Sequence, residues 1–208
     1  MSRNRLFIEA KHAKTPECNF LRSIISRNFP DAEFDFVFMD GCGNLFGEAI
    51  TNQIKSAIDD QENCLILIDA DNVQKNGGFL TKKVWVESSM ASHGINVPFF
   101  IYPDNANDGD VECLMEQIAR RDLHGSWFDC FEDYEKCVAG IKDAGGHKSY
   151  NIPNLKGKLH TYISSMNLNS KAKNKLGSGN WLFDDEKYWD LSSDRLMPLV
   201  TFLKENLK

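Results

Sequence analysis

One stretch of the sequence, Cys64–Gln74 (CLILIDADNVQ), limits the possible folds more than any other. Residues 64–68 are all apolar and do not alternate with polar residues, which is typical of a strand covered on both faces in a parallel sheet. Asp69 and Asp71 follow where this strand ends. Because side chains two positions apart on an extended chain share a face, both carboxylates are expected to point the same way, with Cα atoms roughly 6.5–7 Å apart. The stretch therefore predicts an α/β fold with two close acids at a strand end.

Two interpretations of this acid pair are open. Two close carboxylates repel each other unless a positive charge lies between them. Mg²⁺ (or Mn²⁺) suits that position, since Mg²⁺ binds carboxylate oxygens and keeps water molecules for a substrate phosphate. The alternative is structural: Asp69 begins a turn and Asp71 caps the next helix.

Strand and helix patterns alternate along the first half of the chain. Thr15, Pro16 and Glu17 predict a helix start, with an N-cap, a first-turn proline and an acid that suits the helix dipole. The β-α order predicts a parallel, Rossmann-like sheet of about four strands with helices on both faces. The apolar runs that predict these strands are residues 5–10, 34–39, 64–68 and 97–102.

The other helices of this half are predicted from caps and apolar spacing. Asn44 is expected to cap one helix, and Asp110 to begin another. Gly94 is a predicted helix stop, whereas residues 79–86 before it look less regular. The inner face of the helix after Asn44 is expected to carry Ile50, Ile54 and Ile58.

Residues 121–208 are predicted to form a mainly helical, lysine-rich C-terminal extension, the annex, packed on an α/β domain of residues 1–120. The Asn-, Ser- and Gly-rich stretch 167–180 is expected to be a loop. Apolar residues recur at helical spacing in three sets, at 131–141, 159–166 and 199–203. An aromatic group is predicted to dock the annex on the core, with a nucleic-acid platform as the alternative: Trp181, Phe183, Tyr188 and Trp189.

The net charge of −6 hides an uneven distribution. Residues 136–180 contain eight lysines and one acid, Asp143, so this segment carries +7 and the remainder −13. The Lys136–Lys175 region can bind the phosphate backbone of DNA or RNA, or it can be a solvated face that balances an acidic domain. It has no arginine and only Tyr150 and Tyr162 as stacking aromatics, so both interpretations stay open.

Cysteine spacing and hydropathy restrict the class of protein further. The six cysteines form no CxxC pair, so neither a zinc knuckle nor a thioredoxin-like motif is present. No apolar run approaches the roughly 18 residues of a membrane span, and the start of the chain has no apolar segment of signal-peptide length. We therefore expect a cytoplasmic protein with reduced thiols and no membrane contact.

More acids are predicted to meet at the edge where the strands end. Ligands of open α/β sheets bind outside the carboxyl ends of the strands, and Glu9 ends the first strand just as Asp69 ends the third. The loop after the fourth strand, PDNANDGDVE, can add a second metal site. Alternatively its acids form turns, N-caps and first-turn partners of a helix dipole. The predicted metal ligands are Glu9, Asp69, Asp71, Asp108, Asp110 and Glu112, with Asp104 in the same loop.

Three motifs together resemble a known family. A strand ending in Glu9 (FIEA), a second strand followed by glycine, and a hydrophobic strand ending in Asp-x-Asp (LIDADN) resemble the Toprim fold of bacterial primases, type IA and type II topoisomerases and overcoming-lysogenisation-defect nucleases. With YPDNANDGDVECLMEQI added, the chain is similar over Arg5–Arg120 to an uncharacterised group of Toprim-like bacterial proteins. The resemblance implies that Glu9 is a general acid or base, or a ligand, and that Asp69 and Asp71 hold Mg²⁺. Ala10 stands where the Toprim glutamate is often followed by glycine.

These residues suit metal-dependent hydrolysis of phosphodiester bonds in nucleic acid. Metal ions would neutralise the phosphate and lower the pKa of the attacking water, with Glu9 available for proton transfer. In the annex, LKGKLH carries Lys156, Lys158 and His160, which can reach a transition-state phosphate or can simply be exposed helix positions. The predicted catalytic residues are Glu9, Asp69, Asp71 and Lys158.

Two other functions fit the sequence. GCGNLFG (residues 41–47) follows a strand and opens a helix, as in nucleotide-binding Rossmann-like proteins, although its third glycine is one place late. Gly41 and Gly43 can instead serve a sharp turn between strand and helix. The second alternative is a non-catalytic Toprim-like module that binds a partner protein or nucleic acid through the annex.

Overall fold

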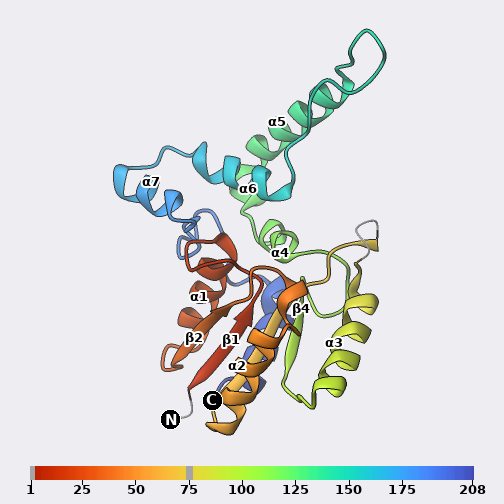
Figure 1. The fold of residues 1–208 in the computed structure, drawn as a ribbon. Helices are drawn as coiled ribbons and strands as arrows, with labels where there is room; N and C mark the ends of the chain where they lie inside the picture. The colour runs from red at the N-terminus through yellow and green to blue at the C-terminus, as the bar shows by residue number, and fades with distance from the viewer. Residues whose placement is uncertain (1–2, 74–76) are drawn as a thin grey trace.

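The computed structural model describes residues 3–73 and 77–208 (Figure 1). Its four strands form one parallel sheet in the order β2-β1-β3-β4, so that β1 and β3 lie at the centre. The strands are β1 (Asn4–Ile8), β2 (Phe34–Phe38), β3 (Asn63–Asp69) and β4 (Phe99–Tyr102). The predicted α/β class and the parallel, Rossmann-like sheet are confirmed.

Helices cover both faces of this sheet (Figure 1). Successive side chains of a strand alternate between faces, so Leu65 and Leu67 of β3 join one apolar core while Ile66 and Ile68 join the other. This burial on both sides explains the absence of alternation in the sequence of β3. The first core includes α1 (Pro16–Asn28), α4 (Val111–Gln117) and α8 (Met197–Asn206), and the second includes α2 (Glu48–Asp59) and α3 (Phe79–His93).

The helix starts show which local predictions were accurate. Thr15 caps α1 as expected, since its hydroxyl accepts a hydrogen bond from the Cys18 N–H. Asn44 does not cap α2: it ends a short 3₁₀ turn (Cys42–Asn44), and Gly47 precedes the helix instead. The α2 side chains that reach the core include Ile50 and Ile54, whereas Ile58 is 41 % exposed, because fourfold spacing drifts around a helix of 3.6 residues per turn.

Two segments predicted to be irregular are helical. Residues 79–86 begin α3, a helix that buries little more than Val86 and Met90 and leaves Leu80 and Val84 exposed, so its sequence lacks a clear apolar stripe. The predicted stop at Gly94 is confirmed by its left-handed backbone. Residues 167–180 contain α7 (Ser170–Gly177), which Asn169 caps through the Ala172 N–H.

The annex has a projecting arm and a docked part. Helix α5 (Arg121–Gly140) extends away from the sheet and leads into a long connection to α6 (Leu155–Ser164) (Figure 1). The docked part is aromatic: Phe183 lies 5.4 Å from Phe20 of α1, between ring centroids, and Trp189 is fully buried. After a 3₁₀ turn (Asp194–Leu196), α8 packs on the sheet, where Phe202 lies 5.4 Å from Phe100 of β4. The division at residue 120 stays a prediction.

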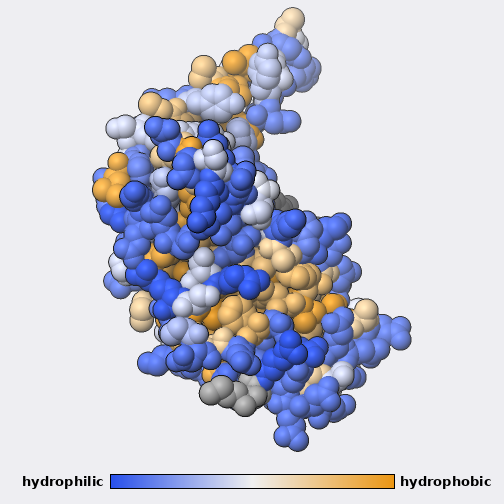
Figure 2. Space-filling model, turned by 90° about the vertical axis from the view of Figure 1, so that its left-hand side faces the viewer, coloured by the Kyte–Doolittle hydropathy of each residue, from blue (hydrophilic) through white to orange (hydrophobic). Residues whose placement is uncertain are grey.

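No helix within residues 3–73 and 77–208 is both long and apolar enough to cross a membrane. Apolar side chains do gather on the side of the molecule where β2 forms one edge of the sheet (Figure 2). The partly exposed Phe34 and Phe36 of β2 contribute to that side, and the Arg22 guanidinium lies 5.9 and 5.2 Å from their ring centroids. A charged group over these rings covers part of their apolar surface.

The first and last described parts of the chain meet at the amino ends of the strands, whereas the predicted acids follow the carboxyl ends. Asn4 of β1 donates a hydrogen bond to the Lys208 carbonyl at 2.8 Å and accepts one from the Lys208 N–H at 3.0 Å. Asn63 of β3 donates to the Asn4 side chain at 2.7 Å and to the Asn206 carbonyl at 2.5 Å. These amides join the start of the central strands to the end of α8.

Candidate functional site

Glu9 follows β1 directly, and its carboxylate joins two neighbouring segments of the sheet edge. One oxygen accepts a hydrogen bond from the Asp69 N–H of β3 at 2.8 Å, and the other accepts from the Cys42 N–H after β2 at 3.2 Å. Burial raises the pKa of Glu9, although these N–H donors and Lys82 act in the opposite direction. The structure thus brings Glu9 to the end of β3, where the sequence predicts it.

Asp69 is the last residue of β3 and faces the start of α4. Its carboxylate accepts a hydrogen bond from the Val111 N–H at 2.9 Å, one of the free donors of that helix terminus. Burial raises the pKa of Asp69 well above its usual range, and the charges of Glu9, Glu17 and Glu112 raise it further. Asp69 therefore belongs to a crowded group of acids.

Asp71 has a different environment, and the extended chain from which a common face of the two aspartates was expected ends at Asp69. Asp71 adopts a left-handed backbone (φ 58°), so the strand geometry does not continue past Asp69. Its carboxylate pairs with Lys82 of α3 at 3.0 Å, and the Lys82 ammonium also lies 2.8 Å from the Cys42 sulfur. Burial lowers the pKa of Lys82, but the hydrogen bonds with Cys42 and Asp71 outweigh it and hold this pKa above its usual range.

The aspartates of the β4–α4 loop accept backbone hydrogen bonds, two of them at helix starts and one within the loop. Asp108 accepts from the Phe79 N–H at 2.8 Å and so caps α3 from a distant part of the chain. Asp110 caps its own helix, α4, through the Cys113 N–H at 2.9 Å. Asp104 accepts from the Asn107 N–H at 2.8 Å within the loop. All three therefore fit the alternative in which these acids form turns and caps. Their role as metal ligands stays a prediction. We refer to Asp71, Asp108 and Asp110 as the outer acids.

Glu112 and Glu17 are buried, and the second of them was missed as a site residue. Glu17, in the first turn of α1, is 9 % exposed and accepts a hydrogen bond from the backbone of Glu9. Burial, followed by the charges of Glu9 and Glu112, raises the pKa of Glu17 to about 8. The first-turn position explains the error, since an acid there ordinarily needs no partner beyond the helix dipole. We refer to Glu9, Glu17, Asp69 and Glu112 as the inner acids.

Two further groups reach the inner acids. Lys156 of α6 pairs with Glu112 at 2.9 Å and interacts with the charges of Glu17 and Asp69. Although burial lowers the pKa of Lys156, these acids raise it overall. Tyr102, at the end of β4, is fully buried, and its hydroxyl has no hydrogen-bond partner within the described residues. Burial raises the pKa of this hydroxyl, and the charges of Glu17 and Asp69 add to the effect.

Lys158 is separated from this group by its own ion pairs. Its ammonium lies 2.9 Å from Glu116 and 3.7 Å from Glu132, and 5.9 Å from the Phe128 ring centroid. The side chain is 9 % exposed and is buried where α6 of the annex packs against α4. The structure brings Lys156 to the acids, and the predicted catalytic role of Lys158 stays a prediction.

The donor chemistry of the inner acids fits a hard divalent cation. All four are carboxylates, and Mg²⁺ commonly takes one or two of these together with water and substrate phosphate. These four acids outnumber the two lysines near them, Lys156 and Lys82, and Lys82 is already paired with Asp71. Within the described part of the chain, no group of three or more His, Cys, Asp or Glu side chains is already arranged to hold a metal ion. A cation here would therefore need a pair of carboxylates, or a change of rotamers.

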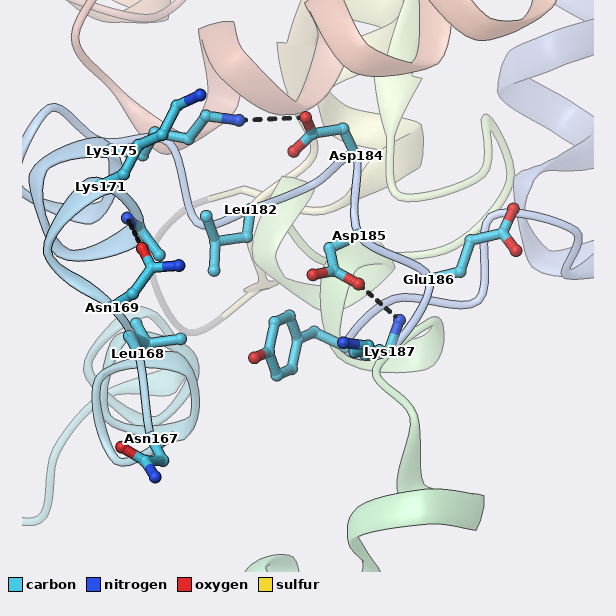
Figure 3. A pocket seen from close by; sticks show the side chains of 12 residues that line it. Asn167, Leu168, Asn169, Lys171, Lys175, Leu182, Asp184, Asp185, Glu186 and Lys187 are labelled. Carbon is cyan, nitrogen blue, oxygen red and sulfur yellow. Dashed lines mark hydrogen bonds and ion pairs between the residues drawn. The ribbon is translucent and has the colours of Figure 1, made fainter.

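A hollow of about 500 Å³ lies elsewhere, between α7 and residues 182–188 (Figure 3). Lysines and acids line it in similar numbers, and Lys175 pairs with Asp184 across it at 3.1 Å. None of the inner or outer acids lines this hollow. Its charges are largely balanced, so the group at the carboxyl edge of the sheet is the stronger candidate for chemistry.

Comparisons with known proteins give one match. The family described as "Protein of unknown function (DUF3226)" matches residues 3–208, nearly the whole chain. No curated protein and no solved structure matches the sequence or the fold.

Proposed function

We propose that this chain, which belongs to the DUF3226 family of unknown function, hydrolyses phosphodiester bonds in nucleic acid with Mg²⁺ or Mn²⁺, as a Toprim-type nuclease. The observation that carries the proposal is the bond between the Glu9 carboxylate and the Asp69 N–H. It brings a half-buried glutamate and a half-buried aspartate from the ends of two central strands to the carboxyl edge of a parallel sheet, where ligands of such sheets bind.

The proposed ligands are Glu9, Asp69 and Asp71. A metal ion between them would neutralise the substrate phosphate and lower the pKa of an attacking water. Asp71 is 35 % exposed on its side chain and pairs with a flexible lysine, so it can turn from Lys82 toward a cation. Glu9, whose pKa is raised by burial, is placed to accept a proton and later release it.

The annex is the proposed contact for the substrate backbone. Lys156 already lies over the acids, and the Lys136–Lys175 region adds positive charge that can follow a DNA or RNA strand. Without such groups, the acidic edge would repel a polyanion. The predicted cytoplasmic setting is part of this proposal.

The test combines metal binding with cleavage. Mg²⁺ and Mn²⁺ are titrated by calorimetry into the wild type, Asp71→Asn and Asp129→Asn, a control at an exposed acid of α5. The same proteins are incubated with labelled single- and double-stranded DNA and RNA and resolved on gels. We expect wild type and control to bind metal and cleave one of these substrates, and Asp71→Asn to lose at least tenfold in both. Metal-independent cleavage, or no cleavage of any substrate, would contradict the proposal.

A further inference from the structure

Glu17 and Glu112 are the two inner acids that the proposed catalytic set leaves unused. Glu17 comes from α1 and Glu112 from α4, and both are at least nine-tenths buried. Each interacts with the charge of the other and with that of Asp69. Two ionised carboxylates with so little access to water are costly unless a positive charge accompanies them. Their place in the core therefore calls for a counter-charge whenever both are ionised.

Tyr102 gives independent support for a ligand at this point. Its side chain is fully buried at the end of β4, and its hydroxyl faces the charges of Glu17 and Asp69. This hydroxyl has no hydrogen-bond partner within residues 3–73 and 77–208. Buried polar groups are nearly always hydrogen-bonded in folded proteins, so the Tyr102 hydroxyl indicates a missing partner.

Within residues 3–73 and 77–208, Lys156 supplies the one ammonium that pairs with Glu112. It lies in the first turn of α6, where the helix dipole disfavours a positive charge, so its position depends on Glu112 rather than on its own helix. Its side chain is 53 % exposed, and its long stem can move the ammonium into solvent. Lys156 is therefore a counter-charge that a stronger cation can displace.

We propose that Glu17 and Glu112, with the Tyr102 hydroxyl, form an inner site for one divalent cation, Mg²⁺ or Mn²⁺. This site is additional to the ion assigned to Glu9, Asp69 and Asp71, and it concerns binding alone, so it does not depend on hydrolysis. Asp108 and Asp110, the sequence-based candidates for a second site, are occupied as helix caps. Binding requires the glutamates to change rotamer and Lys156 to withdraw.

The test counts bound ions. Mn²⁺ is titrated into the folded full-length chain, and free Mn²⁺ is measured by electron paramagnetic resonance. Wild type is expected to bind two ions, whereas Glu17→Gln and Asp71→Asn each bind one. The control is Glu48→Gln, which changes an exposed first-turn glutamate of α2 and is expected to keep both ions. Thermal melting of each variant checks that it folds.

The outcomes separate the inner site from the proposed nuclease site. A Glu17→Gln variant that binds as many ions as wild type overturns the inner site. If wild type binds one ion that only Asp71→Asn loses, the inner site is wrong and the proposed function keeps its metal. If only Glu17→Gln loses it, the inner site stands and the Asp-x-Asp site falls. No binding at all overturns both.

Two more variants probe the same site without removing an acid. Lys156→Met is expected to tighten the inner ion several-fold, because no ammonium competes with it, whereas Lys171→Met at an exposed annex position is expected to leave affinity unchanged. Tyr102→Phe removes only the unpartnered hydroxyl and is expected to weaken the inner ion several-fold. If Lys156→Met weakens binding, or Tyr102→Phe leaves it unchanged, the proposed ligand set is wrong.

Discussion

The inner and outer acids lie at the same edge of the sheet and yet have opposite environments. The outer acids each have a dedicated partner: Asp71 pairs with Lys82, and Asp108 and Asp110 cap helices. The inner acids crowd together, and burial and the charges of neighbouring acids raise the pKa values of Glu17 and Asp69. The difference teaches that position at a strand end does not by itself shift the pKa of an acid. Burial beside like charges shifts it, and the substitutions below measure that contrast.

The largest effect is expected in the way the free energy of unfolding depends on pH, through Glu17. Because the pKa of Glu17 rises from 4.5 in the unfolded chain to about 8 in the fold, the folded state holds its proton more tightly. This stabilisation is complete below pH 4.5 and is lost as pH rises through about 8. We expect the cation-free wild type to lose roughly 3–5 kcal/mol of its free energy of unfolding from this group.

Denaturant unfolding at pH 5 and pH 8, with a chelator present, measures that loss. Glu17→Gln keeps the shape of the side chain without its charge, so its stability is expected to vary much less with pH. Glu48→Gln, at an exposed first-turn position, is the control and should follow the wild type. Identical pH profiles for wild type and Glu17→Gln would show that Glu17 is not an inner acid.

The next effect is expected at Asp69. Asp69→Ala removes the acceptor of the Val111 N–H and leaves that buried donor unpaired, which costs about 1–3 kcal/mol. Asp69→Asn retains an acceptor oxygen and removes a crowded charge, so it is expected to be at least as stable as wild type at pH 8. Chemical denaturation of both variants distinguishes the two effects. Equal losses in the alanine and asparagine variants would show that the charge matters more than the hydrogen bond.

A smaller effect is expected at an outer acid that caps a helix. Asp110→Ala removes the N-cap of α4, which costs about 1 kcal/mol. Asp110→Ser restores a capping oxygen and should recover most of that stability. Thermal melting at pH 7 compares them. A serine variant as unstable as the alanine variant would show that Asp110 acts through more than its cap.

The smallest effect is expected at Asp71. Its ion pair with Lys82 is partly exposed, and such pairs contribute about 0–1 kcal/mol. Asp71→Asn is therefore expected to melt within a few degrees of wild type, even though the variant is expected to lose metal binding. A large loss of stability would place Asp71 with the inner acids.

The sequence predicted the sheet because its signals are local and consistent. Parallel strands end at one edge, so the positions of Glu9 and Asp69 next to their strands were enough to bring them together. The orientation of Asp71 was not predictable by the same rule, because the chain adopts a left-handed conformation there. Glu17 was missed because its burial depends on how α1 returns against the sheet edge, which is a tertiary contact. The closeness of Pro16 and Glu17 to Glu9 in the chain was the only available signal.

The hydrogen bonds of Asn4 with Lys208 also have a consequence for the order of folding. They close a loop that spans almost the entire chain, so their entropic cost is at the upper limit for a protein of this length. During synthesis β1 emerges first. The amino ends of β1 and β3 cannot make all of their hydrogen bonds until the final residues of α8 leave the ribosome. Until then, the Asn4 and Asn63 amides can bond to Glu33 and to each other, but their bonds to Asn206 and Lys208 cannot form.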